Sequence, residues 1–229
     1  MKILSRILQW DTEFFGFGVG RIDSTDASDS DVMASITALK AEGCRLIYVF
    51  TNSPLKLENV EMSLVDRKRS YILRSPKMKK ETCEVSNFIG KSESLYNLGI
   101  QSGEYSRYNI DCRIGETEFR RLYKKWVDNA VNGEFGDYVF SVDVDCRPVG
   151  FITARRMNDM ISIGLFATDK EFRGHGIGGS LIQRIENVAF DLKTEVEVTT
   201  QADNINACRF YSNRGYEIRE ESLVYHVWI

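Results

Sequence analysis

The stretch Arg173-Gly174-His175-Gly176-Ile177-Gly178-Gly179 decides how the rest of this sequence is interpreted. It follows an apolar run over 160–167 that predicts a strand, and it opens a segment in which Ile177, Leu181 and Ile185 recur at helical spacing. Glycines permit a tight turn and the close approach of a ligand. The free N–H groups at a helix start, with the positive end of the helix dipole, bind anions. The order strand, glycine-rich turn, helix therefore indicates a pyrophosphate site.

Several kinds of glycine-rich loop compete for this assignment. Gly174-x-Gly176-x-x-Gly179 formally matches the dinucleotide fingerprint, but only 50 residues follow Gly179, and a Rossmann half needs further βα units. A P-loop is excluded, because it requires a lysine where Gly179 stands before Ser180. An Arg/Gln-x-x-Gly-x-Gly/Ala loop is matched by Arg173, Gly176 and Gly178. The remaining alternative is a glycine-rich turn that binds nothing.

Composition and charge narrow the class of protein. A chain of 229 residues with 43% apolar residues can form one large or two small domains with a real core. A net charge of -3 gives no support for nucleic-acid or anionic-membrane partners. The five cysteines are far apart and form no C-x-x-C pair, so we expect no metal site and reduced thiols. Arg6, Asp11 and Glu13 interrupt any signal-peptide core, and no run approaches the ~18 apolar residues of a membrane span. We therefore expect a cytoplasmic protein.

The first part of the chain, 1–104, is predicted to form a small α/β unit. Its aromatic stretch 9–18 suggests a bent strand or loop, and the run Asp66-Arg67-Lys68-Arg69 is interpreted as the solvated face of a strand. The other expected elements are a helix over 31–42 ended by Gly43, a buried strand over 46–50, a short helix before Met62 and a strand over 65–73.

The second part, 105–229, holds a strongly amphipathic helix over 116–131, whose apolar stripe, including Trp126, is assigned to the core. The polar and aromatic segment 102–108 is expected to link the two parts and to line a site. An antiparallel meander that leads into the glycine loop argues against a parallel Rossmann sheet. The expected strands are 138–144, 149–156, 160–168, 195–200 and 216–228, with a short helix from Asn204. The segment 62–71 has the texture of 215–225, which suggests that the first unit is a degenerate copy of the second.

Two motifs together resemble a known superfamily. Arg173-x-x-Gly-x-Gly, followed by Asn204-x-x-Ala207-x-x-x-Tyr211-x-x-x-Gly215-Tyr216, is similar to the two signature segments of the GNAT acyltransferases. The resemblance covers about 140–229. It implies an α/β fold with a central mixed, mostly antiparallel sheet flanked by helices, preceded by a smaller α/β unit. It also implies acetyl-CoA as acetyl donor and no metal.

The resemblance carries roles for particular residues. The backbone of Phe166, Ala167 and Thr168 would pair with the pantetheine arm. Asn204 would bond near the pantetheine, and Tyr211 would lie beside the thioester sulfur as general acid, although a core tyrosine is the alternative. His175 is a bystander rather than a base. The N–H groups expected to hold the pyrophosphate are those of Arg173, Gly174, His175, Gly176, Ile177, Gly178 and Gly179.

A narrower resemblance suggests the acceptor. The segments 10–16, 102–107 and 122–126 look like those of GNAT enzymes that acetylate TDP-linked 4-amino-4,6-dideoxyhexoses for cell-surface polysaccharide. This implies a small-molecule TDP-amino-sugar partner, with a homodimer left open. The candidates for stacking on the thymine are Trp10, Phe15, Tyr105 and Tyr108. Either Arg107 or the run Arg67-Lys68-Arg69 is expected to meet the sugar pyrophosphate. Asp11, Glu13 and Asp203 are the candidate general bases.

Two other functions stay open at this stage. One is a GNAT enzyme that acetylates a protein or peptide amine and uses the first unit for docking. The other is a non-catalytic sensor that binds acetyl-CoA through the loop. The tyrosine at position 211 argues against the sensor, because binding alone needs no acid at the sulfur.

Overall fold

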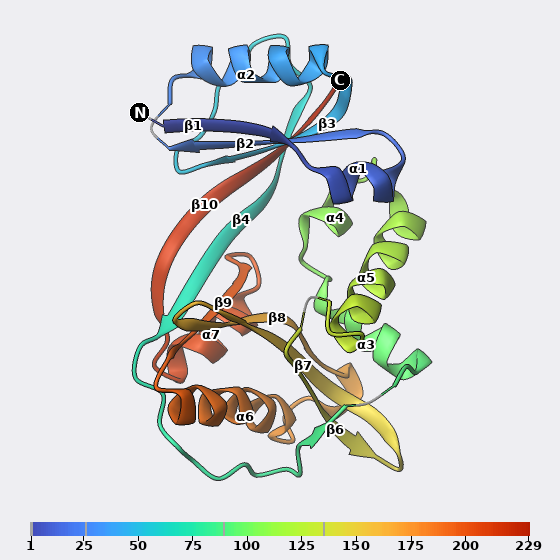
Figure 1. The fold of residues 1–229 in the computed structure, drawn as a ribbon, viewed down its shortest axis with the longest axis vertical. Coiled ribbons are helices and arrows are strands. Elements are labelled where there is room, and N and C mark those ends of the chain that lie inside the picture. The colour runs from blue at the N-terminus through green and yellow to red at the C-terminus, as the bar shows by residue number, and fades with distance from the viewer. Residues whose placement is uncertain (1, 26, 89, 135) are drawn as a thin grey trace.

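The computed structural model describes residues 2–25, 27–88, 90–134 and 136–229 (Figure 1). Within these residues ten strands form one sheet, in the order β1-β2-β3-β10-β4-β9-β8-β7-β6-β5. The predicted units 1–104 and 105–229 share this sheet.

The first part of the chain supplies five strands and three helices in the order expected of an α/β unit. Ser28 caps α2, because its side chain accepts from the Asp31 N–H while Asp31 accepts from the Ser28 N–H. The elements are β1 Lys2–Ile7, α1 Gln9–Phe15, β2 Gly18–Thr25, α2 Asp29–Ala41, β3 Cys44–Thr51, β4 Met62–Leu73, β5 Ser86–Asn87 and α3 Glu93–Ser102.

The second part supplies the remaining elements, and its three meander strands lie where the sequence predicts them. Its elements are α4 Arg107–Ile110, α5 Gly115–Val131, β6 Tyr138–Val144, β7 Arg147–Met157, β8 Met160–Thr168, a 3₁₀ turn Lys170–Phe172, α6 Ile177–Leu192, β9 Glu195–Gln201, α7 Ile205–Asn213 and β10 Glu217–Trp228. The mixed, mostly antiparallel sheet flanked by helices confirms the expected fold class.

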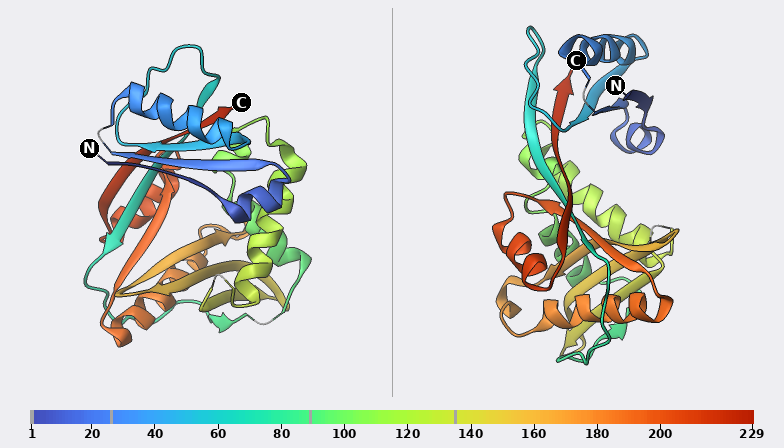
Figure 2. Two further views of the ribbon diagram at one scale, coloured as in Figure 1. Left: turned by 45° about the horizontal axis from the view of Figure 1, so that its top comes forward. Right: turned by 90° about the vertical axis from the view of Figure 1, so that its left-hand side faces the viewer.

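The sheet has an internal symmetry centred on β4 and β10. These two strands pair antiparallel along most of their length, and the two views of Figure 2 show them running side by side between the two ends of the molecule. On one side, β10 pairs with β3, and the parallel pair β2/β3 is connected by α2. On the other, β4 pairs with β9, and the parallel pair β8/β9 is connected by α6. This arrangement agrees with the sequence similarity between 62–71 and 215–225, because each segment contributes one of the two central strands.

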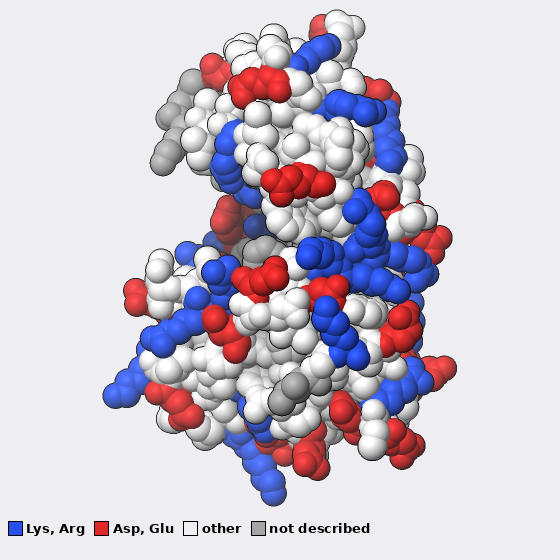
Figure 3. Space-filling view, turned by 45° about the vertical axis from the view of Figure 1, so that its right-hand side comes forward, with Lys and Arg blue, Asp and Glu red and all other residues white. Residues whose placement is uncertain are grey.

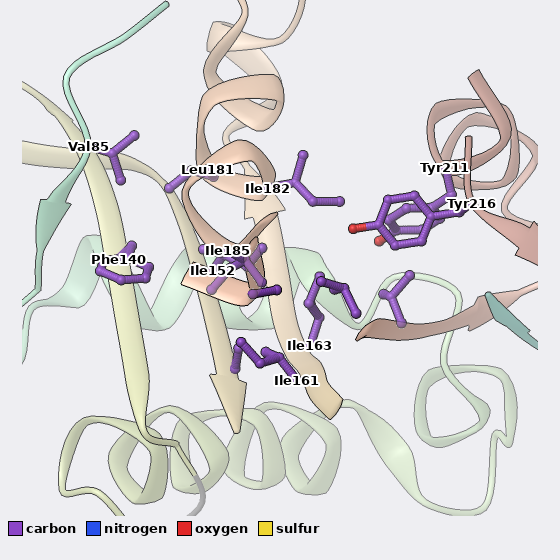
Figure 4. Close-up of a cluster of buried hydrophobic side chains, with 14 of the residues drawn as sticks. Val85, Phe140, Ile152, Ile161, Ile163, Leu181, Ile182, Ile185, Tyr211 and Tyr216 are labelled. Atoms are coloured by element: carbon purple, nitrogen blue, oxygen red, sulfur yellow. The ribbon is translucent and has the colours of Figure 1, made fainter. Parts of the chain in front are cut away.

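Helices cover both faces of the second half of the sheet. Neighbouring residues on β7 point to opposite faces. Ile152 accordingly lies in the core beneath α6, with Leu181 and Ile185 (Figure 4), whereas Phe151 lies in a cluster with Leu95 of α3. All five side chains are buried, so β7, which pairs with the strand that leads into the glycine loop, is packed from both sides.

Two local predictions in the first part are wrong, and one helix was not predicted. The aromatic stretch 9–18 contains the helix α1, which ends at Gly16 in the left-handed conformation (φ 73°). The short helix expected before Met62 is irregular chain instead, and Asn59 there has a φ of 57°, which a helix does not allow. Helix α3 was not foreseen, although its start carries a recognisable cap in which the Ser92 hydroxyl accepts from the Leu95 N–H.

Candidate functional site

The parallel strands β8 and β9 separate halfway along their length. They pair only from Met160 to Ile163, although β8 continues to Thr168 beside β7. The register of β7 and β8 shifts next to Gly164, as in a β-bulge, and the Thr153 hydroxyl accepts from the Leu165 N–H at 2.8 Å. A Cβ on Gly164 would lie 2.8 Å from that hydroxyl oxygen, so the bulge requires glycine. Beyond it, the edge of β8 that faces β9 is open to pair with a ligand.

A cavity of about 900 Å³ extends from this opening. The space-filling view shows the molecule hollowed at mid-height between its upper and lower parts (Figure 3). The cavity is bordered by 163–168 of β8, 198–201 of β9, the start of α6, helix α7, the segment 101–108, helix α5 and β4. It therefore joins the glycine loop to residues supplied by the first half of the chain.

The glycine loop forms one end of the cavity. Gly174 and Gly176 have φ values of 84° and 80°, which favour glycine, and Gly176 immediately precedes α6. Gly178 is favoured for a different reason, since an added Cβ would lie 3.3 Å from the Thr168 hydroxyl oxygen at the cavity wall, closer than most such contacts. The first N–H groups of α6 have no carbonyl partner within the helix, so a pyrophosphate fits this end. Arg173 is exposed, and its Nε donates to the Thr168 carbonyl at 3.3 Å.

Not every predicted loop residue borders the cavity. Arg173 and Gly178 do, as do Phe166, Ala167 and Thr168 of β8. The other predicted loop residues are not among the described residues that line the cavity: Gly174, His175, Gly176, Ile177 and Gly179. The Ile177 side chain is part of the core, and the His175 Nδ1 lies 3.2 Å from the Phe172 carbonyl.

Helix α7 and its N-cap bring Tyr211 and Asn204 to the wall of the cavity. The Asn204 side-chain oxygen accepts from the Ala207 N–H at 3.1 Å, so this residue also caps the helix. Tyr211 packs against Tyr71 and lies beside Tyr216, and all three belong to the hydrophobic cluster that packs beneath α6 (Figure 4). Burial raises the pKa of the Tyr211 phenol above its usual range, so the hydroxyl keeps its proton and can donate it.

The far end of the cavity is aromatic and holds a partly buried cation, Arg107. The Arg107 guanidinium lies 4.4 Å from the ring centroid of Tyr108 and 4.6 Å from that of Tyr48, and it donates to the Tyr108 hydroxyl. Its Nε has no hydrogen-bond partner among the described residues. Tyr105 borders the same space, and so does Trp126, which had been assigned to the core alone.

Two predicted acceptor residues lie elsewhere. Trp10 stacks on Phe14 with ring centroids 5.4 Å apart. Phe15 packs between Phe17 and Tyr108, behind the ring that borders the cavity. Neither is among the described residues that line the cavity.

The carboxylate that sequence reasoning missed is Asp66. The run 66–69 was interpreted as a solvated strand face, and this is wrong for Asp66, which is 9% exposed and borders the cavity. Of the earlier candidates, Asp11 accepts from the Tyr48 hydroxyl at 3.3 Å, and Glu13 accepts from the Gln9 amide. Asp203 is exposed and borders only a smaller neighbouring pocket. The alternation of β4 could not reveal this burial, because the groups around Asp66, such as Arg107 and Gln201, come from distant parts of the sequence.

Comparison with known proteins identifies the family. Residues 104–216 match the acetyltransferase (GNAT) family. The match includes the cavity's loop, its splayed strand and α7, so residues 104–216 form a GNAT acetyltransferase domain. Among solved structures, the fold is similar to a GCN5-related N-acetyltransferase from Sphaerobacter thermophilus, with a TM-score of 0.56, 11% identity and coverage of 98% of this chain and 76% of that one.

Further similarities concern named relatives. The chain is 24% identical over 140 residues to the spore coat polysaccharide biosynthesis protein SpsD of Bacillus subtilis (strain 168), covering 61% of this chain and 48% of that protein. It is 31% identical over 111 residues to dTDP-fucosamine acetyltransferase of Escherichia coli O6:H1, covering 47% and 46%. The matches thus span about half the length of these relatives. The PaiA N-acetyltransferase of Thermoplasma acidophilum, solved with coenzyme A, has a TM-score of 0.50 at 15% identity, over 64% of this chain and 98% of that one.

The described residues lack two further kinds of feature. In that part of the chain no helix is both long and apolar enough to cross a membrane. No three side chains of the kinds that ligate metals converge within it.

Proposed function

We propose that this protein transfers the acetyl group of acetyl-CoA to the amino group of a nucleotide-linked sugar, a TDP-4-amino-4,6-dideoxyhexose. The observation that carries the proposal is the single cavity that joins the glycine loop, the open edge of β8, Tyr211 and the partly buried Arg107. Donor and acceptor would enter it from opposite ends and react in one ternary complex.

The donor end supports acetyl-CoA through its shape. The first turn of α6 offers N–H groups to a pyrophosphate, and Gly178 leaves room for it beside Thr168. The open backbone edge of Phe166 to Thr168 suits the amide groups of a pantetheine arm, which can pair as a strand would. When bound, acetyl-CoA supplies the activated thioester. Asn204 and Tyr211 border the path between loop and acceptor end, as the reaction requires.

The acceptor end supports a nucleotide sugar through its charge and its rings. The Arg107 guanidinium, with an unpartnered Nε, is suited to a diphosphate. Tyr105 is 37% exposed at the cavity and offers a face on which a thymine can stack. One relative named above is a dTDP-fucosamine acetyltransferase and another acts in polysaccharide biosynthesis, which favours this class of acceptor over a peptide.

In the proposed reaction the acceptor nitrogen attacks the thioester carbon directly, and Tyr211 protonates the departing sulfur. A departing thiolate needs a proton, and the buried phenol remains protonated across the working pH range. The backbone of β8 and the α6 N–H groups hold the donor so that the thioester lies beside Tyr211.

The function is tested by incubating the protein with acetyl-CoA and a panel of acceptors. The panel holds TDP-amino-sugars that differ in the carbon bearing the amine, the matching sugars without the nucleotide, and lysine peptides. Mass spectrometry should show an added acetyl group only on a TDP-amino-sugar, with equal release of free thiol. Acetylation of peptides instead would support the docking alternative, and CoA binding without turnover of any amine would support the sensor.

A further inference from the structure

Asp66 differs from the other carboxylate that borders the main cavity. It is 9% exposed, and its Oδ1 is buried without a hydrogen-bond partner among the described residues. Glu104, in contrast, is exposed and forms an ion pair with Lys170. Leaving a buried carboxylate oxygen without a donor costs free energy, so such an atom in a native protein calls for an explanation.

The position of Asp66 places it at the acceptor end. It borders the main cavity and also an adjoining pocket of about 230 Å³, and Tyr105 and Gln201 share both borders. Lys68, two residues further along β4, lines the main cavity as well, as expected for alternate residues of one strand. A ligand bound between Arg107 and Tyr211 would therefore pass this face of β4.

Charged and titratable groups surround Asp66 from several elements. They are Lys68 on β4, Arg107 on α4, Tyr105 before it, Tyr123 on α5 and Asp203 after β9. Burial raises the pKa of the Asp66 carboxyl to about 6, against the opposing influence of Arg107 and of a hydrogen bond from Gln201. Such a group is mostly ionised at pH 7 and accepts a proton more readily than an exposed aspartate.

We propose that Asp66 is the general base that takes the proton from the acceptor's ammonium group. This assignment rests on the proposed function. Asp66 accepts one proton, directly or through one water, and the freed nitrogen lone pair forms the N–C bond. The C–S bond breaks, its electron pair leaves with sulfur, and sulfur takes the Tyr211 proton. Loss of the second nitrogen proton to water balances re-protonation of Tyr211, and Asp66 returns its own proton to solvent.

The decisive experiment compares pH profiles of turnover for the wild type and Asp66→Asn. The wild-type rate should rise from acid and become level above about pH 6, where Asp66 is ionised. Asp66→Asn preserves the shape of the side chain, but the amide cannot accept a proton. Its turnover at pH 7 should fall by roughly 10²-fold, and its rate should keep rising through pH 9 as the free amine increases. The affinity for CoA, measured by calorimetry, should not change.

Three further variants guard against a merely structural effect. Asp66→Glu retains a carboxylate and should restore the level region of the profile. Asp143→Asn makes the same chemical change on an exposed part of β6 and should behave as the wild type. Asp203→Asn tests the neighbouring acid. The proposal is overturned if Asp66→Asn stays within twofold of wild-type turnover with a level profile, or if Asp203→Asn loses the level region instead.

A failure of the proposed substrate and a failure of the proposed base give different experimental results. The profiles are measured with whichever amine the wild type acetylates, so a non-sugar acceptor would refute the proposed substrate without deciding the base. An infrared difference titration of wild type against Asp66→Asn needs no turnover. It should show a carboxyl group that titrates near pH 6. Titration close to the ordinary value of about 4 would overturn the assignment even if every amine proved inert.

Discussion

Gly178→Val should weaken CoA binding sharply while leaving the fold intact. The valine Cβ alone would lie 3.3 Å from the Thr168 hydroxyl oxygen and 3.6 Å from the Phe166 ring, at the wall where the phosphate is expected to approach. The two methyl groups beyond it must enter the cavity. Displacing the pyrophosphate by that much removes at least one hydrogen bond to a charged group, about 1.5–3 kcal/mol. Affinity should therefore fall about 10- to 160-fold.

Titration calorimetry with CoA measures this change, and a matched variant controls for the valine itself. Ser30→Val introduces the same side chain at the second position of α2, the helix that corresponds to α6 in the symmetry of the sheet. Ser30 is not among the described residues that line the cavity, so CoA affinity should be unaffected. Wild-type affinity in Gly178→Val would refute the assignment of the loop to the pyrophosphate, provided that both variants melt cooperatively.

Three other outcomes test the rest of the site and the core. Tyr211→Phe should lower turnover by about 10²–10⁴-fold with CoA affinity unchanged; turnover within twofold of wild type would exclude it as the acid. Arg107→Met should raise the acceptor KM and, because Arg107 lowers the Asp66 pKa, shift the acidic limb of the turnover profile to higher pH; an unshifted limb would contradict this coupling. Burial lowers the His226 pKa to about 4, so between pH 6.5 and 4 the unfolded chain binds a proton that the native state excludes. The free energy of unfolding should then fall by about 3 kcal/mol as the pH is lowered across that range, and denaturant titrations of His226→Gln should lack this slope.

Local patterns were sufficient to predict the donor end of the site. The glycine loop, the strand before it and the helix after it are neighbours in sequence, so periodicity and the need for positive φ locate them. The spacing of Asn204 and Tyr211 likewise reflects one short helix, and both side chains border the cavity with Gly178.

The acceptor end depends on pairings between distant segments, which periodicity does not encode. Asp66 pairs with Val224 of β10, and Arg107 and Gln201 border the same cavity, so its surroundings come from three distant parts of the sequence. The aromatic stretch 9–18 forms a helix without a side-chain cap, so its tertiary packing rather than its sequence decides its conformation. Trp10 and Phe15 are directed away from the cavity by that packing.

The position of β10 between β3 and β4 has a consequence for how the chain folds. β3 and β4 are separated by β10, so the sheet of the first half is incomplete until residue 228 has been synthesised. A nascent chain that has completed only β1 to β4 presents two unsatisfied strand edges for the time needed to make more than 140 further residues. Such edges are templates for pairing with other chains, so this topology exposes the growing chain to mispairing until β10 has been made. It also couples the two halves in one cooperative unfolding unit, since neither sheet keeps its central pair if the other opens.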